Sequence, residues 1–256
     1  MGTSRQNGSL YTKIENRVAT VEFGHPAGNS FVAELLDRLC NELKKLSEDN
    51  SVSLIVLKSE GKRAFCAGAS FDELMAISTP EEGKMFFSGF ANVINAMREN
   101  KKPIIGRVQG KAVGGGVGLI ASCDYVFATE AASIKLSEIS IGIAPLVIAP
   151  AVERKVGKSG LAELSLSPTE WKNAYWAKEK GLYTKVFGSI KEMDKEVEIH
   201  TVQLSGMNPQ ALQAMKRVLW EGTEHWNELL SKRAEMSGEL ALMPETKETL
   251  KKIKSR

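Results

Sequence analysis

The chain has 256 residues, enough for one large domain or for a core with a small appendage. Its composition, 43% hydrophobic and 25% charged, is typical of a globular protein. The formal net charge of +3 is too small to indicate nucleic-acid binding, and no apolar run is long enough to span a bilayer. We therefore expect neither a nucleic acid nor a membrane as a partner.

The N-terminus and the cysteines point to a cytoplasmic protein. The first residues lack the apolar stretch of a signal peptide, and Gln6 stands where an N-myristoylation motif needs Ser or Thr. Three cysteines without metal-ligand spacing cannot all form pairs, as expected for a reducing compartment. The histidines are equally scattered, so no metal site is expected; they are His25, His200 and His225.

The first part of the chain predicts strands alternating with helices. Apolar residues at helical spacing mark a helix over 32–46, and Thr79 followed by Pro80 is a helix start signal. Short apolar runs bounded by turn residues predict strands. In chain order we expect strands at 17–23, 53–57, 103–108, 125–128 and 133–136, and helices at 32–46, 71–77 and from Thr79 onward.

Beyond about residue 146 the pattern becomes mainly helical. No sequence repeat and no low-complexity linker interrupts it. The expected helical stretches are 149–154, 160–166, 169–180, the residues after Ile190, 210–220 and 224–240. The charged tail at 251–254 is interpreted as a solvated helix end.

A cluster of glycines follows the strand at 103–108, with four glycines among the five positions 114–118. Glycine permits close approach of another group to the backbone. Tight packing of a helix on a sheet is one explanation. A dinucleotide-binding turn is another, because Gly116 to Ala121 fits G-x-G-x-x-A and Glu138 lies 20 residues past Gly118. Only helical patterns follow that acidic residue, which disfavours this second explanation.

The third explanation is an oxyanion hole, in which backbone N–H groups bind a developing negative charge. Such a site needs a second donor. The segment at 63–74 offers one, because it is another glycine-containing turn that follows a buried strand and opens a helix. Two similar turns can then face one another.

Four segments together resemble the crotonase superfamily of enoyl-CoA hydratases and isomerases. The likeness extends from about residue 17 to residue 219. The segments, in family order and spacing, are AFCAGASFDEL, KKPIIGRVQGKAVGGGVGLIASCDYVFATEAASIKLSEISIGIAP, VGKSGLAELSL and NPQALQAMKRVL.

The resemblance implies an α/β fold, a crotonase-like spiral of ββα units with a helical C-terminal region. We expect the spiral core at 1–195 and a helical trimerisation region at 196–256. By the same resemblance, the protein is expected to form a homotrimer or a hexamer built as a dimer of trimers. Its partner would be an acyl-CoA thioester substrate, with no separate cofactor because coenzyme A is part of that substrate.

The resemblance also implies the roles of individual residues. The N–H groups of Ala69 and Gly115 would bind the thioester oxygen, and Glu138 would be the catalytic acid–base group. Flanking isoleucines would raise the pKa of Glu138 if it is buried. The expected substrate-binding set is Ala64, Ala67, Gly68, Ala69, Gly115, Gly116 and Gly118.

Gly118 decides which reaction is favoured. The hydratases of this superfamily have a second glutamate there, whereas its isomerases use a lone glutamate at the position of Glu138. A single base can move a double bond from the 3,4 to the 2,3 position without activating water. We therefore expect an enoyl-CoA isomerase. The alternatives are an enoyl-CoA hydratase of fatty-acid or branched-chain acyl-CoA breakdown and a non-catalytic acyl-CoA binder.

Overall fold

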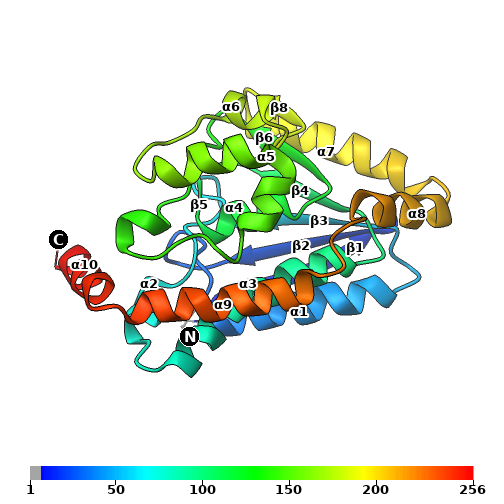
Figure 1. Ribbon diagram of the computed structural model, residues 1–256. Helices are drawn as coiled ribbons and strands as arrows, with labels where there is room; N and C mark the ends of the chain where they lie inside the picture. The colour runs from blue at the N-terminus through cyan, green and yellow to red at the C-terminus, as the bar shows by residue number, and fades with distance from the viewer. Residues whose placement is uncertain (1–6, 256) are drawn as a thin grey trace, which may run out of the picture.

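The structure, a computed structural model, describes residues 7–255, so Gln6 lies outside the described residues. Its centre is a six-stranded sheet in the order β1-β2-β3-β4-β6-β8, with helices on both faces (Figure 1). The pair β1–β2 is antiparallel and the other pairs are parallel. The strands are β1 (Ser9–Glu15), β2 (Val18–Gly24), β3 (Leu54–Ser59), β4 (Ile104–Val108), β6 (Tyr125–Thr129) and β8 (Lys185–Phe187).

A second sheet contains only β5 (Ala112–Val113) and β7 (Ile134–Lys135), which pair in parallel. The short helix α4 (Gly115–Ala121) begins directly after β5. The glycine cluster thus lies where the small sheet passes into a helix.

Most of the remaining residues form helices, five of which begin at a residue whose side chain caps the helix: α2, α3, α6, α7 and α8. Thr79 caps α3 by accepting a hydrogen bond from the N–H of Glu82 (3.2 Å), and Pro80 occupies the first helical position. Besides α4, the helices of residues 7–255 are α1 (Ala33–Glu48), α2 (Phe71–Ala76), α3 (Pro80–Glu99), α5 (Ala149–Leu166), α6 (Ala174–Glu179), α7 (Ile190–Ser205), α8 (Pro209–Leu219), α9 (Trp226–Leu242) and α10 (Pro244–Lys254), with the 3-10 turn η2 (Glu138–Ile141) between β7 and α5.

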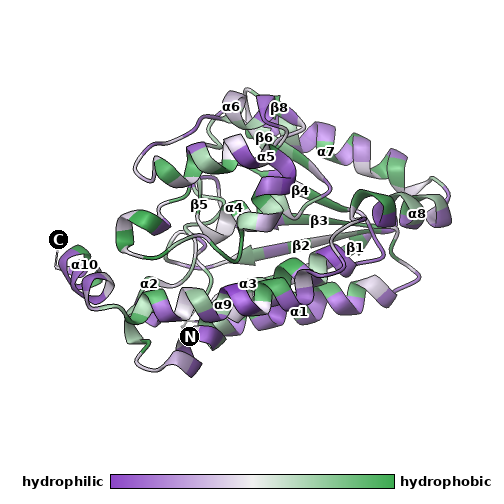
Figure 2. Ribbon diagram, in the orientation of Figure 1, coloured by the Kyte–Doolittle hydropathy of each residue, from purple (hydrophilic) through white to green (hydrophobic). Residues whose placement is uncertain are grey.

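The two faces of the main sheet are covered by different helices. On one face, α7 packs through Met193 and Val197 on a small apolar cluster that includes Val18, Ile105 and Phe127. On the other, α1 and α3 contribute to the larger core. Both helices carry alternating purple and green bands in Figure 2, and their buried residues are mostly apolar, as expected for amphipathic helices packed on a core.

The helix α9 folds back along α3 of the same chain (Figure 1). Their backbones meet at two glycines, because a Cβ atom on Gly83 would lie 2.7 Å from the Cα of Gly238. No side chain fits at this crossing, so the two helices approach more closely than larger residues permit.

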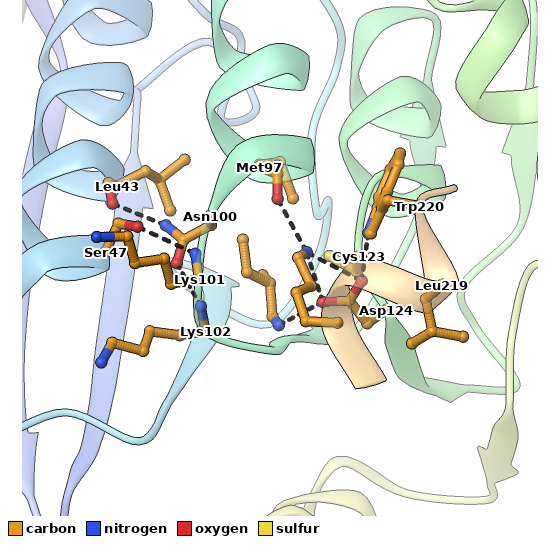
Figure 3. Close-up of polar contacts among 12 residues, drawn as sticks. Leu43, Ser47, Met97, Asn100, Lys101, Lys102, Cys123, Asp124, Leu219 and Trp220 are labelled. Atoms are coloured by element: carbon orange, nitrogen blue, oxygen red, sulfur yellow. Dashed lines mark hydrogen bonds and ion pairs between the residues drawn. The ribbon is translucent and has the colours of Figure 1, made fainter. Parts of the chain in front are cut away.

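A buried ion pair fastens α8 to the body of the protein. The Lys216 ammonium group, on a side chain only 1% exposed, lies 2.8 Å from Asp124 Oδ2 and donates to the carbonyl of Met97. The indole N–H of Trp220 donates to Asp124 Oδ1 (2.7 Å). Figure 3 shows these groups of Met97, Asp124 and Trp220 converging.

The expected α/β fold with C-terminal helices is confirmed. The helix expected at 169–180 is wrong in its first half, because only Ala174–Glu179 is helical and Lys172 bridges to Ile134. The two helices expected at 149–154 and 160–166 are confirmed: α5 consists of two helical segments that meet at a kink, where Gly157 has non-helical angles (φ 70°, ψ 170°). The expected boundary between residues 195 and 196 falls inside α7.

Candidate active site

Two turns lie against each other beside the small sheet. The N–H of Val113 donates to the carbonyl of Cys66 (2.9 Å), which joins the end of β5 to the turn at 66–69. Phe31 holds the same turn from the other side, since its N–H donates to Gly68 O (2.8 Å) and its carbonyl accepts from Ser70 (2.7 Å). Gly68 has φ +95°, a conformation that favours glycine. Ala69 and the glycine cluster are thereby brought together.

Each turn presents an amide N–H that makes no hydrogen bond in the described part of the chain. The carbonyl of Gly114 accepts from the N–H of Val117 (2.8 Å) and so points along α4. Because the peptide unit is planar, the N–H of Gly115 points the opposite way, out of the helix start. Among the hydrogen bonds within residues 7–255, none uses the N–H of Gly115 or of Ala69. Two free donors therefore remain at adjacent turns.

A cavity of about 300 Å³ opens beside these two donors. Its polar side chains, within the part of the chain that the structure describes, are those of Ser137, Glu138 and Ser237. Burial of a polar or charged group without a partner is unfavourable, so few such groups line a pocket of this kind. Most of the wall is apolar, formed by Phe71, Leu74, Phe86, Phe87, Phe90, Val113, Ile141, Ile143, Ala144, Pro145, Leu146, Val147, Ile148 and Ile253.

Glu138 is the ionisable group of this cavity wall. It is the first residue of η2 and is half-buried, but its Oε2 is shielded from solvent and has no hydrogen-bond partner in residues 7–255. Burial raises the pKa of Glu138 to about 7. Its carboxyl group lies against Gly114, where a Cβ atom would come within 2.8 Å of Oε1. A group with this pKa can exchange protons near neutral pH.

Glu138 is the only carboxylate among the cavity-lining residues of 7–255. A Cβ atom on Gly118 would lie 2.4 Å from Ile148 Cγ2, so the space that a side chain at position 118 needs is filled by Ile148. Position 118 lies inside α4, and Ile148 lines the same cavity as Glu138. The space beside position 118 is therefore filled with hydrocarbon.

The expected site residues divide into two groups. Three of them do not line the cavity: the carbonyl of Ala64 accepts from Asn29 and Gln109 (2.9 and 3.1 Å), Gly116 packs on Cys66, and Gly118 packs on Ile148. The structure places the others together along one wall; they are Ala67, Gly68, Ala69, Gly115 and Glu138.

Sequence reasoning missed the apolar wall and the contributions of the C-terminal helices. Ser237 of α9 and Ile253 of α10 line the cavity although they lie about a hundred residues beyond Glu138. Phe86, Phe87 and Phe90 of α3 were not among the expected site residues. Their helical spacing is a usable signal, because all three fall within about one turn and point to the same side.

Two other possibilities can be settled. Burial raises the pKa of the Cys66 thiol to about 12, so it stays protonated and is not a nucleophile at neutral pH. The glycine turn follows β5 of the two-stranded sheet rather than a strand of a Rossmann-type sheet, so the dinucleotide-binding explanation is wrong.

Within residues 7–255 no group of three or more His, Cys, Asp and Glu side chains is arranged to hold a metal ion, and no helix is long and apolar enough to cross a bilayer.

Comparison with known proteins agrees with this geometry. The chain is 31% identical to the peroxisomal Δ(3,5)-Δ(2,4)-dienoyl-CoA isomerase of Arabidopsis thaliana, over 71% of this chain and 69% of that protein. It is also 31% identical to 2,3-dehydroadipyl-CoA hydratase of Escherichia coli (strain K12), over 84% of this chain and 83% of that protein.

The fold matches solved structures over almost the whole chain. A crystal structure of enoyl-CoA hydratase from Bacillus halodurans superposes with a TM-score of 0.88 over 95% of this chain and 99% of that one, at 20% identity. A family sequence model described as enoyl-CoA hydratase/isomerase matches residues 13–253. With the two facing turns and the buried glutamate in place, the chain belongs to the enoyl-CoA hydratase/isomerase family, the crotonases.

Proposed function

We propose that this protein is an enoyl-CoA isomerase that moves a double bond from the 3,4 to the 2,3 position of an acyl-CoA thioester. Glu138 would be its single acid–base group, and the N–H groups of Ala69 and Gly115 would bind the thioester oxygen. The named relatives support an acyl-CoA substrate, since both an isomerase and a hydratase of such thioesters are 31% identical to the chain.

The proposed reaction needs no added water. The Glu138 carboxylate takes a proton from C2, and the electron pair of that C–H bond forms C1=C2 while the thioester oxygen becomes an enolate. The C1=O bond then re-forms and the π electrons of C1=C2 become the C2=C3 double bond. The π electrons of C3=C4 bond the proton that Glu138 returns to C4. Each donor to the enolate oxygen is expected to contribute roughly 10²–10³ in rate.

The observation that carries this proposal is the contact between Gly118 and Ile148. Hydration of a 2-enoyl thioester in this family requires a second carboxylate beside Glu138. Here the space for that group holds an aliphatic side chain, and Glu138 is the ionisable residue among the cavity-lining residues of 7–255. One carboxyl group is enough for a proton transfer from C2 to C4.

The coenzyme A moiety would lie along the turn that contains Ala67 and Gly68. Both residues line the cavity through their backbone, and the N–H of Ala67 is already bound to Gly28 O (3.0 Å). No cofactor apart from the coenzyme A of the substrate is required by this proposal.

The decisive test offers the purified protein 3-enoyl-CoA and 2-enoyl-CoA and follows the absorbance of the conjugated thioester. We expect the absorbance to grow with the 3-enoyl substrate, and the rate to fall by at least about 10²-fold in Glu138→Gln because the proton carrier is removed. The matched control is Glu239→Gln, an exposed carboxylate on α9. Equal rates for wild type and Glu138→Gln would contradict the proposal.

The second candidate function is hydration, and the E. coli relative named as a hydratase favours it. Rapid loss of absorbance from the 2-enoyl substrate would support that candidate against the isomerase. Binding of both thioesters with no reaction would support a non-catalytic acyl-CoA binder. A 3,5-dienoyl thioester belongs in the same assay, because the Arabidopsis relative is named as an isomerase of such compounds.

A further inference from the structure

Two glycines on α4 have different neighbours. Gly114, the residue before the helix, lies against the carboxyl group of Glu138, and Gly118, one turn later, lies against Ile148. Gly114 is not helical (φ 53°, ψ −120°), whereas Gly118 lies inside α4. Glu138 and Ile148 both line the cavity, and Ile148 occupies the place where a side chain at position 118 would project.

Ile148 is held firmly in this place. It is 4% exposed and belongs to the main apolar core. Its carbonyl accepts from Val152 (3.0 Å) at the start of α5, and the carbonyl of Leu146 just before it accepts from Arg233 of α9 (3.2 Å). Because the backbone is bound on both sides and the Ile148 Cβ itself would lie 2.7 Å from a Cβ on residue 118, rotating the side chain does not remove the clash.

The Ile148 side chain also affects which groups a water molecule in the cavity would meet. A buried water molecule usually needs two to four polar partners. Glu138 Oε2 has no partner among residues 7–255, and Ile148 contributes hydrocarbon to the wall of the same cavity. Water beside Glu138 would thus find no second carboxylate among the cavity-lining residues of 7–255 to orient it toward the substrate.

We propose that Ile148 determines the reaction: it occupies the space of a second carboxylate and keeps water from the face of Glu138 where that carboxylate would act. The proposal rests on the role proposed above for Glu138. It adds that the missing carboxylate cannot be restored by changing Gly118 alone.

The contact distances define the variant that should gain hydration. With Ile148→Ala the remaining Cβ atom would still lie 2.7 Å from a Cβ on residue 118, whereas the Cα atom lies at 3.7 Å, an ordinary contact. The required double variant is therefore Gly118→Glu with Ile148→Gly. In it, one carboxylate takes a proton from water as its oxygen bonds to C3, and the other carboxyl group delivers a proton to C2.

The first experiment measures hydration of 2-enoyl-CoA. We expect the hydration rate of the double variant to exceed that of wild type by at least about tenfold. This is less than the roughly 10²–10⁴-fold that a well-placed acid–base group contributes. The matched control, Gly118→Gln with Ile148→Gly, has the same shape without the carboxylate and should stay at the wild-type level. The single variant Gly118→Glu should lose stability without gaining hydration, because its Cβ meets Ile148.

The second experiment does not depend on the double variant folding. Isomerisation is run in D₂O with Ile148→Ala, and the deuterium content of C4 in the product is measured by mass spectrometry or NMR. Opening the wall admits D₂O to Glu138, so we expect more deuterium than in wild type. Ile148→Val keeps the Cγ2 methyl that contacts Gly118 and should retain the wild-type deuterium content.

The outcomes separate this inference from the proposed function. Unchanged deuterium in Ile148→Ala would overturn the inference, as would hydration by Gly118→Glu alone at the level of the double variant. A folded double variant that hydrates no faster than its Gln control would overturn it as well. Absence of isomerisation in wild type would instead contradict the proposed function, while the hydration comparison would still test Ile148.

Discussion

Burial of the Glu138 carboxyl group affects both its chemistry and the stability of the protein. Its Oε2 is enclosed without a partner, and its pKa is about 7 compared with 4.5 for an unperturbed glutamate. Between these two pH values the native protein binds more protons than the unfolded chain. The free energy of unfolding therefore decreases as the pH rises through this range.

The first prediction compares wild type with Glu138→Gln from about pH 5 to about pH 8. The stability of wild type relative to the variant should fall by about 3 kcal/mol at most, because the wild-type carboxyl group ionises in a buried place. The isomerase rate should rise over the same range, since the base must be deprotonated. Denaturant unfolding and initial rates measure the two trends, and a stability difference independent of pH would contradict the burial argument.

Gly115 illustrates a second effect at the scale of single residues. A Cβ atom on it would lie 2.3 Å from Phe90 Cε1, and Phe90 is itself buried against Phe31, with ring centroids 6.0 Å apart. Phe90 also lines the cavity, so an added methyl group must displace either this ring into the substrate space or the backbone that carries the Gly115 N–H.

The second prediction is that Gly115→Ala lowers kcat by about 10²–10³-fold, the usual effect of losing one oxyanion donor. Gly206→Ala is the matched control, because its nearest neighbour would be 3.5 Å away. Steady-state kinetics and circular dichroism should show a folded but slow Gly115 variant. A variant with normal kcat would show that this amide does not bind the thioester oxygen.

At the scale of elements, α10 connects the two sides of the site. Thr246, 2% exposed, donates to the carbonyl of Gly142 (2.8 Å), the residue that ends the turn η2 carrying Glu138. The neighbouring Lys247 donates to the carbonyls of Met75 and Ile77 at the end of α2, which begins just after Ala69. One helix thus contacts both the glutamate segment and the oxyanion segment.

The third prediction concerns this connection. Thr246→Val leaves the Gly142 carbonyl without its donor, so we expect a loss of about 1–3 kcal/mol in the free energy of unfolding. The kcat should fall too, because the turn that carries Glu138 is less well held. Thr249→Val on the same helix removes only an exposed bond to Glu245 and is the control for both measurements. Equal effects of the two variants would argue against a special role for Thr246.

The sequence predicted elements best where one face is buried and one exposed. The helices α1 and α3 show that periodicity clearly, and the cap at Thr79 placed the start of α3. It did not predict β1, because this edge strand has only Ser9 buried and so no alternating pattern. The three-residue strand β8 is too short to carry one.

The same limit applies to the site. Residues that lie in a glycine turn, or at positions matched by the family resemblance, could be named from the sequence; they include Glu138 and the two facing turns. Ile148 could not, because its importance lies in the atoms that it places against Gly118, some thirty residues earlier. Contacts between elements distant in sequence are fixed by packing, which no local pattern encodes.

At the scale of the whole molecule, α8 turns an apolar surface outward. Met215, Val218 and Leu219 are between 42% and 52% exposed, while Lys216 points inward to Asp124. Exposed apolar groups that cluster on one helix are typical of an association surface. We propose that this face contacts further copies of the chain in the homotrimer or hexamer expected from the family resemblance.

The fourth prediction is that Val218→Lys together with Met215→Lys shifts the protein to smaller species, because burying two ammonium groups without partners is unfavourable. Sedimentation velocity at several concentrations measures the change. Met85→Lys, an exposed methionine on α3, is the control and should keep the wild-type distribution. A wild-type protein that sediments as a monomer would contradict the proposed assembly.

The return of α9 along α3, with α10 following it, has a consequence for any such assembly. Ser237 and Ile253 complete the cavity from the same chain that supplies Glu138. We therefore predict that each subunit forms its site without side chains from a neighbouring subunit. Oligomers mixed from wild-type and Glu138→Gln subunits should lose activity in direct proportion to the mutant share, and two differently inactivated subunits should not restore one another.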